Sequence, residues 1–510
     1  MRTNISASRS FPYILTVRCV AFLGAMFAIA APTLLAQTFN PATYKAGSKT
    51  AGIQEAIDAA AKAGGGTVQI PAGTYVLQAV SGHPAILLRS RVNLVGAGAS
   101  STILKLEPNS KAQPAVLANQ NWANPDGAEA DHDITLQGFT IDATAADQVV
   151  RETQLTTAIP MAGLHEVGLR AAEGVGIDAI VRVDPGPNEE IVPILSASSG
   201  TLRAFLMHPH AAGAKVVVLT QRLHGLALVG AANVNLEDLT IENVTMDGVY
   251  LASTVTPTPY HTYCKKINIR HCNFTACHRN GISVIDADDV MIADNNFRDI
   301  TGDPGAPVDI EPNRPENHGN RITIRDNQAS RCYRGMSIAL GLGGPTSANF
   351  RDEVITGNKI SAVLYGWGTY VGNQRAGAIV SHNTISDTAG EGVFVLGSSG
   401  VQVTDNEIVA PGRCHTQGAG NPNCEKPASG MGIRLGDDSR AQQEATGNTV
   451  SGNTIKDDQQ RPTLLYGVEF SSKGTGNKIQ RNVVSHLDPA HGMVVHGAGG
   501  SNAISENSKQ

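Results

Sequence analysis

The sequence is poor in aromatic and charged residues, which make up 5% and 16% of its 510 residues. Its formal net charge is −6, so it lacks the basic excess with which proteins neutralise phosphates, and we expect no nucleic-acid partner. None of the seven cysteines forms a C-x-x-C pair, which argues against a structural zinc site. Beyond the N-terminal segment, no apolar run is long enough to suggest a membrane span.

The N-terminal segment has the form of a secretory signal. Arg2, Arg9 and Arg18 make a basic start, and an apolar run, short for a bilayer, extends from Val20 to Ala31. We expect residues 1–36 to be removed during export to the periplasm or the cell exterior; an uncleaved anchor helix is the alternative. Removal takes away three arginines and no acid, so the net charge of the mature chain becomes −9.

Six cysteines remain after Cys19 leaves with the signal, and an even number in an exported chain permits disulfides. Cys414 and Cys424 flank a short loop rich in Gly, Pro and Asn, and we expect a bridge between them. The other four are expected to be buried thiols or to form one bridge: Cys264, Cys272, Cys277 and Cys332.

What the sequence has in abundance is glycine, with 54 residues, and a repeat built around asparagine. In each copy an apolar–any–apolar segment is followed by Asn, any residue and a further apolar residue. The first full copy runs from Val290 through Asn295 to Phe297, and later copies follow at intervals of 23 to 47 residues. They are centred on Asn327, Asn358, Asn383, Asn406, Asn453, Asn482 and Asn507.

A second motif, Gly-apolar-any-apolar, recurs between these asparagines, as in Gly281-Ile282-Ser283-Val284. Its alternation predicts short strands with one buried face. Two or three such strands in roughly 25 residues, with no helix between them, fit a solenoid whose successive rungs stack about 4.8 Å apart. We expect the recurrent Asn to sit at one corner, to tolerate left-handed backbone geometry and to form an internal ladder of amides.

Residues 37–142 are predicted to hold a cap and the first rungs. Thr50 is expected to start a helix that ends at the glycines 64–66 and would cover the exposed end of the solenoid. One face of this helix is apolar: Ile53, Ala56, Ile57 and Ala60. The motifs I-P-A-G-T-Y at 70–75 and N-L-V-G-A-G at 93–98 come next.

With these motifs, residues 50–106 resemble the start of the pectate-lyase-like superfamily of the rhamnogalacturonase/epimerase type, and the repeats from 233 to 507 resemble its rungs. The resemblance implies an all-β, right-handed parallel β-helix with an N-terminal capping helix, and a polysaccharide as partner. The superfamily includes lyases, glycoside hydrolases, epimerases and phage tailspikes, so the reaction stays open. The polygalacturonase N-T-D and G-H-G signatures and the D-P-H-E of alginate epimerases are missing.

Residues 143–225 break the rhythm, with short apolar runs spaced by Gly and Pro. We interpret them as a small β insertion; irregular rungs of the same helix are the alternative. The main β-helix then occupies residues 226–510.

Chemistry must come from outward-facing strand positions and long turns, because the inward positions fill the core. Val308 and Ile310 should point inward, so Asp309 and Glu311 should point outward together, about 7 Å apart along the strand. Two like charges so placed should raise the pKa of one carboxyl, giving the acid and the base or nucleophile of a glycoside hydrolase. Outward positions on successive rungs predict a stripe: Tyr250, Ser283, Asp309, Ser337, Phe394, Arg434 and Glu469.

Asp286 and Arg279, one rung earlier, are predicted to assist these two carboxylates. Arg279 or Arg334 could instead neutralise a uronate carboxylate, which favours a polysaccharide lyase as the alternative. A surface ion-pair ladder on a non-catalytic glycan-binding or surface protein is the third possibility. Six side chains are predicted to bind substrate: His278, Arg314, Arg334, Tyr250, His261 and Trp367.

The sequence contains no dedicated metal-binding loop, so we expect no cofactor. Calcium is the alternative, because neighbouring acids on a β-helix can share a hard cation. The mature chain is expected to be free of the membrane, and its oligomeric state is open.

Overall fold

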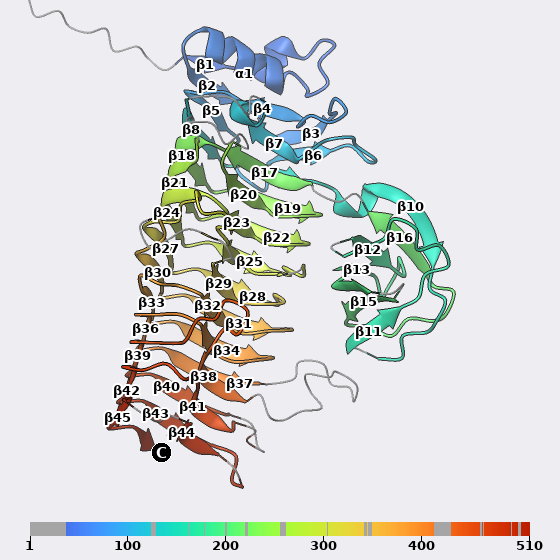
Figure 1. The fold of residues 1–510 in the computed structure, drawn as a ribbon. Helices are drawn as coiled ribbons and strands as arrows, with labels where there is room; N and C mark the ends of the chain where they lie inside the picture. Colours follow the sequence, from blue (N-terminus) through green and yellow to red (C-terminus); the bar gives the residue numbers. More distant parts are fainter. Residues whose placement is uncertain are drawn as a thin grey trace, which may run out of the picture. The chain divides into compact units, whose positions relative to one another are not determined.

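The computed structural model describes residues 37–510 except 124–128, 162, 178, 199–200, 220–222, 255–261, 303, 341–343, 345–348, 413–429, 459–461, 463, 491 and 498–500. All described residues belong to one compact unit. Three long parallel sheets wind through it as a right-handed parallel β-helix, which confirms the predicted fold class (Figure 1). None of the described helices is long and apolar enough to cross a membrane.

Each rung gives one strand to each sheet. The 14-stranded sheet holds, in spatial order, β1 (Thr38–Phe39), β2 (Gly66–Gln69), β5 (Val92–Val95), β8 (Asp131–Gln137), β18 (Ala231–Glu237), β21 (Cys264–Arg270), β24 (Ala287–Ala293), β27 (Ile322–Arg325), β30 (Glu353–Thr356), β33 (Ala378–Ser381), β36 (Gln402–Thr404), β39 (Thr449–Ser451), β42 (Lys478–Gln480) and β45 (Ala503–Ser505).

The 13-stranded sheet follows along the chain. It holds β3 (Gly73–Leu77), β6 (Thr102–Leu106), β9 (Thr140–Asp142), β19 (Thr240–Val244), β22 (Asn273–Cys277), β25 (Asn296–Arg298), β28 (Gln328–Ser330), β31 (Lys359–Val363), β34 (Thr384–Thr388), β37 (Glu407–Pro411), β40 (Thr454–Lys456), β43 (Val483–Ser485) and β46 (Ser508–Lys509).

The 12-stranded sheet completes each rung and carries the candidate site. It holds β4 (Ile86–Leu88), β7 (Ala115–Asn119), β17 (His224–Val229), β20 (Val249–Ala252), β23 (Ile282–Val284), β26 (Val308–Ile310), β29 (Met336–Ala339), β32 (Thr369–Gly372), β35 (Val393–Leu396), β38 (Met431–Gly436), β41 (Tyr466–Ser471) and β44 (Met493–His496).

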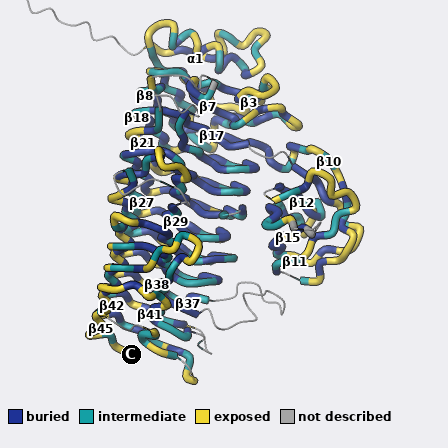
Figure 2. The backbone as a smooth tube through the Cα atoms, viewed as in Figure 1, coloured by how far each residue is buried: buried dark blue, intermediate teal, exposed yellow. Residues whose placement is uncertain are grey.

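Equivalent apolar side chains stack from rung to rung inside the helix. Ile267 pairs with Val290 in the 14-stranded sheet, and the rings of Phe274 and Phe297 stack with centroids 4.8 Å apart in the 13-stranded sheet. Figure 2 shows buried residues along the strands and exposed ones mainly in the connecting turns and the outer part of the insertion. The interior is therefore one continuous apolar column, and only the outer faces and turns are available for chemistry.

The N-terminal end of the helix is covered by α1 (Ile53–Lys62), which follows the short 3-10 helix η1 (Pro41–Tyr44). Its buried residues are the four that the sequence predicted. The start is two residues later than predicted, because Gly52, with φ of 88°, is the N-cap. Thr50 still contributes, since its Oγ1 accepts a hydrogen bond from the Gln54 N–H at 3.1 Å.

The predicted asparagine ladder is present at the corner between the 14- and 13-stranded sheets. Asn358 is typical: its Nδ2 donates to Asn383 Oδ1 at 3.0 Å, and its Oδ1 accepts from Asn327 Nδ2 at 3.0 Å. The backbone expectation was wrong by one position. The left-handed residue precedes each asparagine, as Asp326 (φ 56°) and His382 (φ 56°) do, so the asparagine itself is free to face inward.

The sequence repeat did not reveal a second, shorter ladder. Asn448 donates to Asn477 Oδ1 at 3.1 Å, and Asn477 donates to Asn502 Oδ1 at 3.0 Å. These three asparagines precede strands of the 14-stranded sheet, at the corner that follows the 12-stranded sheet.

The residues that break the repeat form two small antiparallel sheets after the 3-10 helix η2 (Ala145–Asp147). One has the order β10 (Val149–Gln154), β16 (Lys215–Leu219), β12 (Ile180–Val183) and β13 (Glu190–Pro193); the other has β11 (Gly163–Val167), β15 (Thr201–Leu206) and β14 (Ser196–Ser198). We call residues 149–219 the insertion. It has its own apolar core and packs on the β-helix through Phe205, whose ring meets Tyr333 at 5.7 Å and Tyr365 at 5.5 Å.

The four cysteines of the repeat region are free and buried. Burial raises the pKa of Cys264, Cys272 and Cys332 to about 12 and that of Cys277 well above its usual value. The predicted Cys414–Cys424 bridge lies outside the described residues.

Candidate functional site on the 12-stranded sheet

Outward side chains of the 12-stranded sheet form one stripe along the helix. Asp309 pairs with Ser283 on one side and with Ser337 on the other, so these three residues are neighbours on the exterior sheet. The register runs Tyr250, Ser283, Asp309, Ser337, Tyr370, Phe394, Arg434, Glu469 and His496.

The Gly-apolar-any-apolar motif did not identify two residues of the stripe, Tyr370 and His496. Tyr370 follows Gly368 by two positions, but the intervening Thr369 is polar and hides the motif. His496 of β44 pairs with Glu469 of β41. It follows Gly492 by four positions rather than two, so the sequence pattern did not identify it.

Two adjoining cavities lie over this stripe. The larger has a volume of about 810 Å³ and is lined by Trp122, His224, Tyr250 and Arg314 among others. The smaller has a volume of about 350 Å³ and is lined by Asp309, Arg334, Ser337, Trp367 and Tyr370 among others. Arg279 and Glu311 line both, so the two cavities meet at this ion pair and form one groove.

Asp309 is a carboxyl group under strong desolvation, with only 2% of its surface exposed. Burial, with a further contribution from the charge of Glu311, raises the pKa of Asp309 to about 7. Arg279 and a hydrogen bond with Ser337 act in the opposite direction. Asn280 Nδ2 lies 3.4 Å from Asp309 Oδ2, and Oδ1 has no hydrogen-bond partner among the described residues. Near neutral pH this carboxyl is therefore divided between its acid and its ionised form.

Arg279 connects the acids of the groove. Its Nη1 lies 2.9 Å from Asp247 Oδ2 and its Nη2 lies 3.4 Å from Glu311 Oε2. Asp247 is fully buried, and although burial opposes its ionisation, Arg279, His224 and the Asn280 N–H outweigh that effect and lower the pKa of Asp247. Asp247 thus holds the Arg279 guanidinium in place through Nη1, and Nη2 is left to pair with Glu311.

His224 and Tyr250 stand together on the floor of the larger cavity. Their rings stack with centroids 4.6 Å apart and planes 16° from parallel. His224 Nδ1 lies 3.3 Å from both the backbone nitrogen and Oδ2 of Asp247. Burial, followed by the charge of Asp247, raises the pKa of Tyr250. An imidazole and a phenol are therefore held beside the Arg279–Glu311 pair.

Sequence reasoning missed His224, Asp247 and Trp122. A usable signal exists for the first two, because each directly precedes the glycine that opens its strand segment, as Arg334 and Trp367 do. Trp122 lies in the short helix α2 (Gln120–Ala123), and nothing in the repeat marks it.

Of the predicted binding residues, Tyr250 and Arg314 line the larger cavity and Arg334 and Trp367 the smaller. The Arg334 guanidinium carbon lies 5.0 Å from the centre of the Trp367 ring, which in turn lies 4.6 Å from that of Tyr370. His261 lies outside the described residues.

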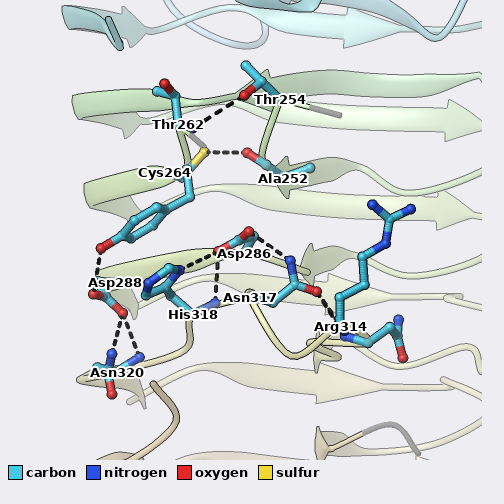
Figure 3. Close-up of polar contacts among 12 residues, drawn as sticks. Ala252, Thr254, Thr262, Cys264, Asp286, Asp288, Arg314, Asn317, His318 and Asn320 are labelled. Carbon is cyan, nitrogen blue, oxygen red and sulfur yellow. Dashed lines mark hydrogen bonds and ion pairs between the residues drawn. The ribbon is translucent and has the colours of Figure 1, made fainter. Parts of the chain in front are cut away.

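Two predicted placements were wrong. His278 is buried away from both cavities, near Thr301 Oγ1 at 3.3 Å and the Ile191 backbone of the insertion, and burial lowers its pKa to about 4. Asp286 also lines neither cavity: it follows β23 at the corner that leads into β24, where Asn317 and His318 bind its carboxylate (Figure 3). Both residues lie in turns rather than strands, where the alternation of strand positions does not predict the direction of a side chain.

Among the residues that the structure describes, no group of three or more His, Cys, Asp or Glu is arranged to hold a metal ion. Two acids of the groove, Asp247 and Glu311, are paired with Arg279.

Comparisons with known proteins match three parts of the chain to families, and the second and third of these parts overlap. Residues 45–169 match the family described as rhamnogalacturonase A/epimerase, pectate lyase-like, and residues 215–375 match the right handed beta helix region family. Residues 308–486 match the family described as periplasmic copper-binding protein (NosD).

Among curated proteins, the mannuronan C5-epimerase AlgE4 of Azotobacter vinelandii is 38% identical over 90 residues, which are 17% of this chain and 16% of the epimerase. Alginate lyase 7 of the same organism is 36% identical over 96 residues, 18% of this chain and 10% of the lyase. The chain therefore spans only a small part of these relatives.

Similar solved structures cover far more of the chain at low identity. The A-module of Azotobacter vinelandii mannuronan C-5 epimerase AlgE6 has a TM-score of 0.57 and 16% identity, covering 92% of this chain and 99% of that module. The family 28 exopolygalacturonase of Yersinia enterocolitica has a TM-score of 0.54 and 13% identity, covering 92% and 78%. Fold and cavities thus define a right-handed parallel β-helix protein with a groove over one sheet. Residues 45–169 are thus similar to the pectate-lyase-like family, and residues 215–375 to the family of right-handed β-helix regions.

Proposed function

We propose that this chain is a carbohydrate-active enzyme that hydrolyses a polysaccharide in the groove of the 12-stranded sheet. The observation that carries the proposal is Asp309, a cavity-lining carboxyl whose pKa is raised to about 7 next to a second carboxyl, Glu311. Glycosidases need one carboxyl that still holds its proton near neutral pH and one that is ionised.

In this mechanism Asp309 donates its proton to the leaving oxygen of the glycosidic bond. Glu311, ion-paired with Arg279, acts as the base that activates water or as the nucleophile. Trp367 and Tyr370 supply apolar ring surface for the sugar, and Arg334 and Arg314 donate hydrogen bonds to its oxygens.

The test is a screen of neutral and acidic polysaccharides for new reducing ends, with parallel ultraviolet detection of unsaturated products. Asp309→Asn and Glu311→Gln should each lower kcat by at least about a hundredfold. Glu407→Gln, which alters an exposed acid paired with Lys456 on the 13-stranded sheet, is the matched control and should leave the rate unchanged. Full activity in both groove variants, or binding without turnover on every polysaccharide, would end the proposal.

Proton abstraction from a uronate is the second candidate function, with β-elimination or epimerisation as its outcome. It is favoured by the stacked His224 and Tyr250 beside Arg279, and by the partial similarity to epimerases and an alginate lyase. Arg279 would pair with the uronate carboxylate, and His224 or Tyr250 would take the proton from the neighbouring carbon.

The two candidates predict opposite variant patterns. Elimination or epimerisation of mannuronan or alginate should be lost in Tyr250→Phe and His224→Gln and should survive in Asp309→Asn. Hydrolysis should be lost in Asp309→Asn and only weakened in Tyr250→Phe. Chelation with EDTA tests the calcium alternative for either reaction.

Export is part of the proposal. The basic and apolar residues 1–36 and the match to a family described as periplasmic support it. N-terminal sequencing of protein from a bacterial host checks it; an intact Met1 on exported protein would argue for an anchor instead.

A further inference from the structure

A buried carboxylate outside the groove holds one wall of the larger cavity. Asp286 Oδ2 accepts a hydrogen bond from Asn317 Nδ2 at 2.7 Å, and its Oδ1 accepts from the His318 N–H at 2.8 Å (Figure 3). Asp286 has no exposed surface and Asn317 only 3%. Burial opposes ionisation, but hydrogen bonds from His318, Ser253 and Asn317 outweigh it and lower the pKa of Asp286.

Asn317 also fixes the start of the loop formed by residues 313–320. Its Oδ1 accepts hydrogen bonds from the backbone N–H groups of Asn313 at 3.2 Å and Arg314 at 2.9 Å (Figure 3). Asn313, Arg314 and Asn317 all line the larger cavity. One carboxylate and one carboxamide therefore set where the Arg314 side chain leaves the backbone.

The far end of the same loop is fixed as well. The His318 ring stacks on Tyr263 with centroids 3.7 Å apart and planes 3° from parallel. Tyr263 Oη lies 3.3 Å from Asp288 Oδ2, and Asp288 Oδ1 accepts from the Asn320 backbone N–H at 2.8 Å. Residues 313–320 are thus held at both ends by acids that follow β23 or lie in β24.

We propose that Asp286, through Asn317, is a positioning residue that presents Asn313 and Arg314 to the sugar bound in the larger cavity. The inference rests on the proposed function for its substrate, whereas the loop geometry does not depend on it. Asp286 itself touches no substrate, and its role is distinct from that of Asp309 and Glu311.

Asp286→Asn is the direct variant, because it replaces one acceptor oxygen with a donor in a site surrounded by donors. Its effect on the loop can be measured without any substrate. In a Trp367→Phe background Trp122 is the only tryptophan left, and it lines the same cavity as Arg314. Acrylamide quenching of Trp122 should increase in Asp286→Asn and stay unchanged in Asp289→Asn, which alters a partly exposed acid of the following strand β24 that is paired with Arg321.

Kinetics on the polysaccharide identified by the screen separate positioning from general damage. Asp286→Asn should raise KM about tenfold with a smaller change in kcat. In an Arg314→Ala background the same change should add little, because the side chain that it misplaces is already gone. Additive losses in the double variant would overturn the proposal.

Asn317→Ser tests the same bridge without disturbing a buried charge, and it should reproduce both effects if Asp286→Asn folds poorly. Unchanged quenching in both variants would overturn the inference even if the enzyme is active. Conversely, a chain that turns over no polysaccharide but shows the quenching change would contradict the proposed function and leave the loop mechanism standing.

Discussion

Asp309 is the residue at which environment changes chemistry most directly. Burial and the charge of Glu311 raise its pKa to about 7, while the hydrogen bond with Ser337 acts to lower it. A general acid works in its protonated form, so activity should fall as pH rises through about 7. Ser337→Ala removes the opposing hydrogen bond and should move this alkaline limb upward by several tenths of a pH unit to about one.

The pH profile of kcat/KM measures this shift directly. Ser283→Ala, one rung earlier on the same stripe, is the matched control and should move the limb less. An alkaline limb that stays fixed, or moves to lower pH, in Ser337→Ala would mean that Asp309 is not the group whose proton controls the rate.

Glu353 is a second buried carboxyl, distant in role from the groove. Burial raises its pKa to about 9, and Gln374 Nε2 donates to its Oε2. The folded state therefore holds a proton that the unfolded state releases above its ordinary pKa, so the stability contribution is intact at low pH and falls as pH rises from about 4.5 toward 9. Glu353→Gln removes this dependence.

The thermal midpoint of Glu353→Gln relative to the native chain should therefore improve between pH 5 and pH 8, by an amount equivalent to at most about 4 kcal/mol. Circular dichroism melts at the two pH values measure it, with Glu407→Gln as the exposed control. If the thermal midpoints of the native chain and Glu353→Gln change by the same amount between the two pH values, Glu353 is already ionised in the folded protein.

Among the structural elements, the asparagine ladder is the most regular. Asn358 Nδ2 donates to Asn383 Oδ1 and to the Ile324 carbonyl, and its Oδ1 accepts from the Asn327 N–H, each at 3.0 Å. Asn358→Ala leaves several buried groups without partners and should cost roughly 3 kcal/mol. Asn507→Ala, in the last rung, should cost under about 1 kcal/mol because that residue is partly exposed.

Denaturant unfolding of the two variants tests this ordering. Equal losses would mean that the ladder contributes register rather than stability. Partial unfolding confined to the rungs near Asn358 is compatible with the prediction, because each rung of a solenoid contacts only its neighbours.

The sequence predicted the position of residues that recur in every rung, and it did not predict the position of residues in turns. Asn327 and Asn358 belong to a repeat, and the repeat predicted that they lie at one corner of the helix. The outward direction of the Asp309 side chain was predicted from the alternation of strand residues. Asp286 and His278 lie in turns, where the alternation of strand residues does not predict the direction of a side chain. In the structure neither residue lines the groove. Asp247 meets Arg279 across 32 residues, a contact that depends on rung length rather than on any local motif.

For the molecule as a whole, the insertion is the part that sequence periodicity could delimit but not place. Its own strands explain why the repeat stops, whereas its packing depends on single contacts with turns far along the chain. Tyr333 Oη donates to the Phe205 carbonyl at 3.0 Å, and Tyr333 is separated from Phe205 by 128 residues. Ile177 of the insertion, 59% exposed, also lines the larger cavity, so this packing shapes the groove.

Tyr333→Ala should therefore loosen the insertion without unfolding the rungs, because it removes a buried ring from the contact and leaves the interior column untouched. Limited proteolysis with mass spectrometry should show cuts within 149–219 appearing at least several-fold faster, with the fragments of the β-helix still resistant. Tyr333→Phe keeps the ring and loses one hydrogen bond, so its cleavage should change little, at a cost of about 1 kcal/mol. Unchanged cleavage in Tyr333→Ala would mean that the two insertion sheets hold their place by other contacts, and general cleavage of the rungs would mean that Tyr333 supports the β-helix itself.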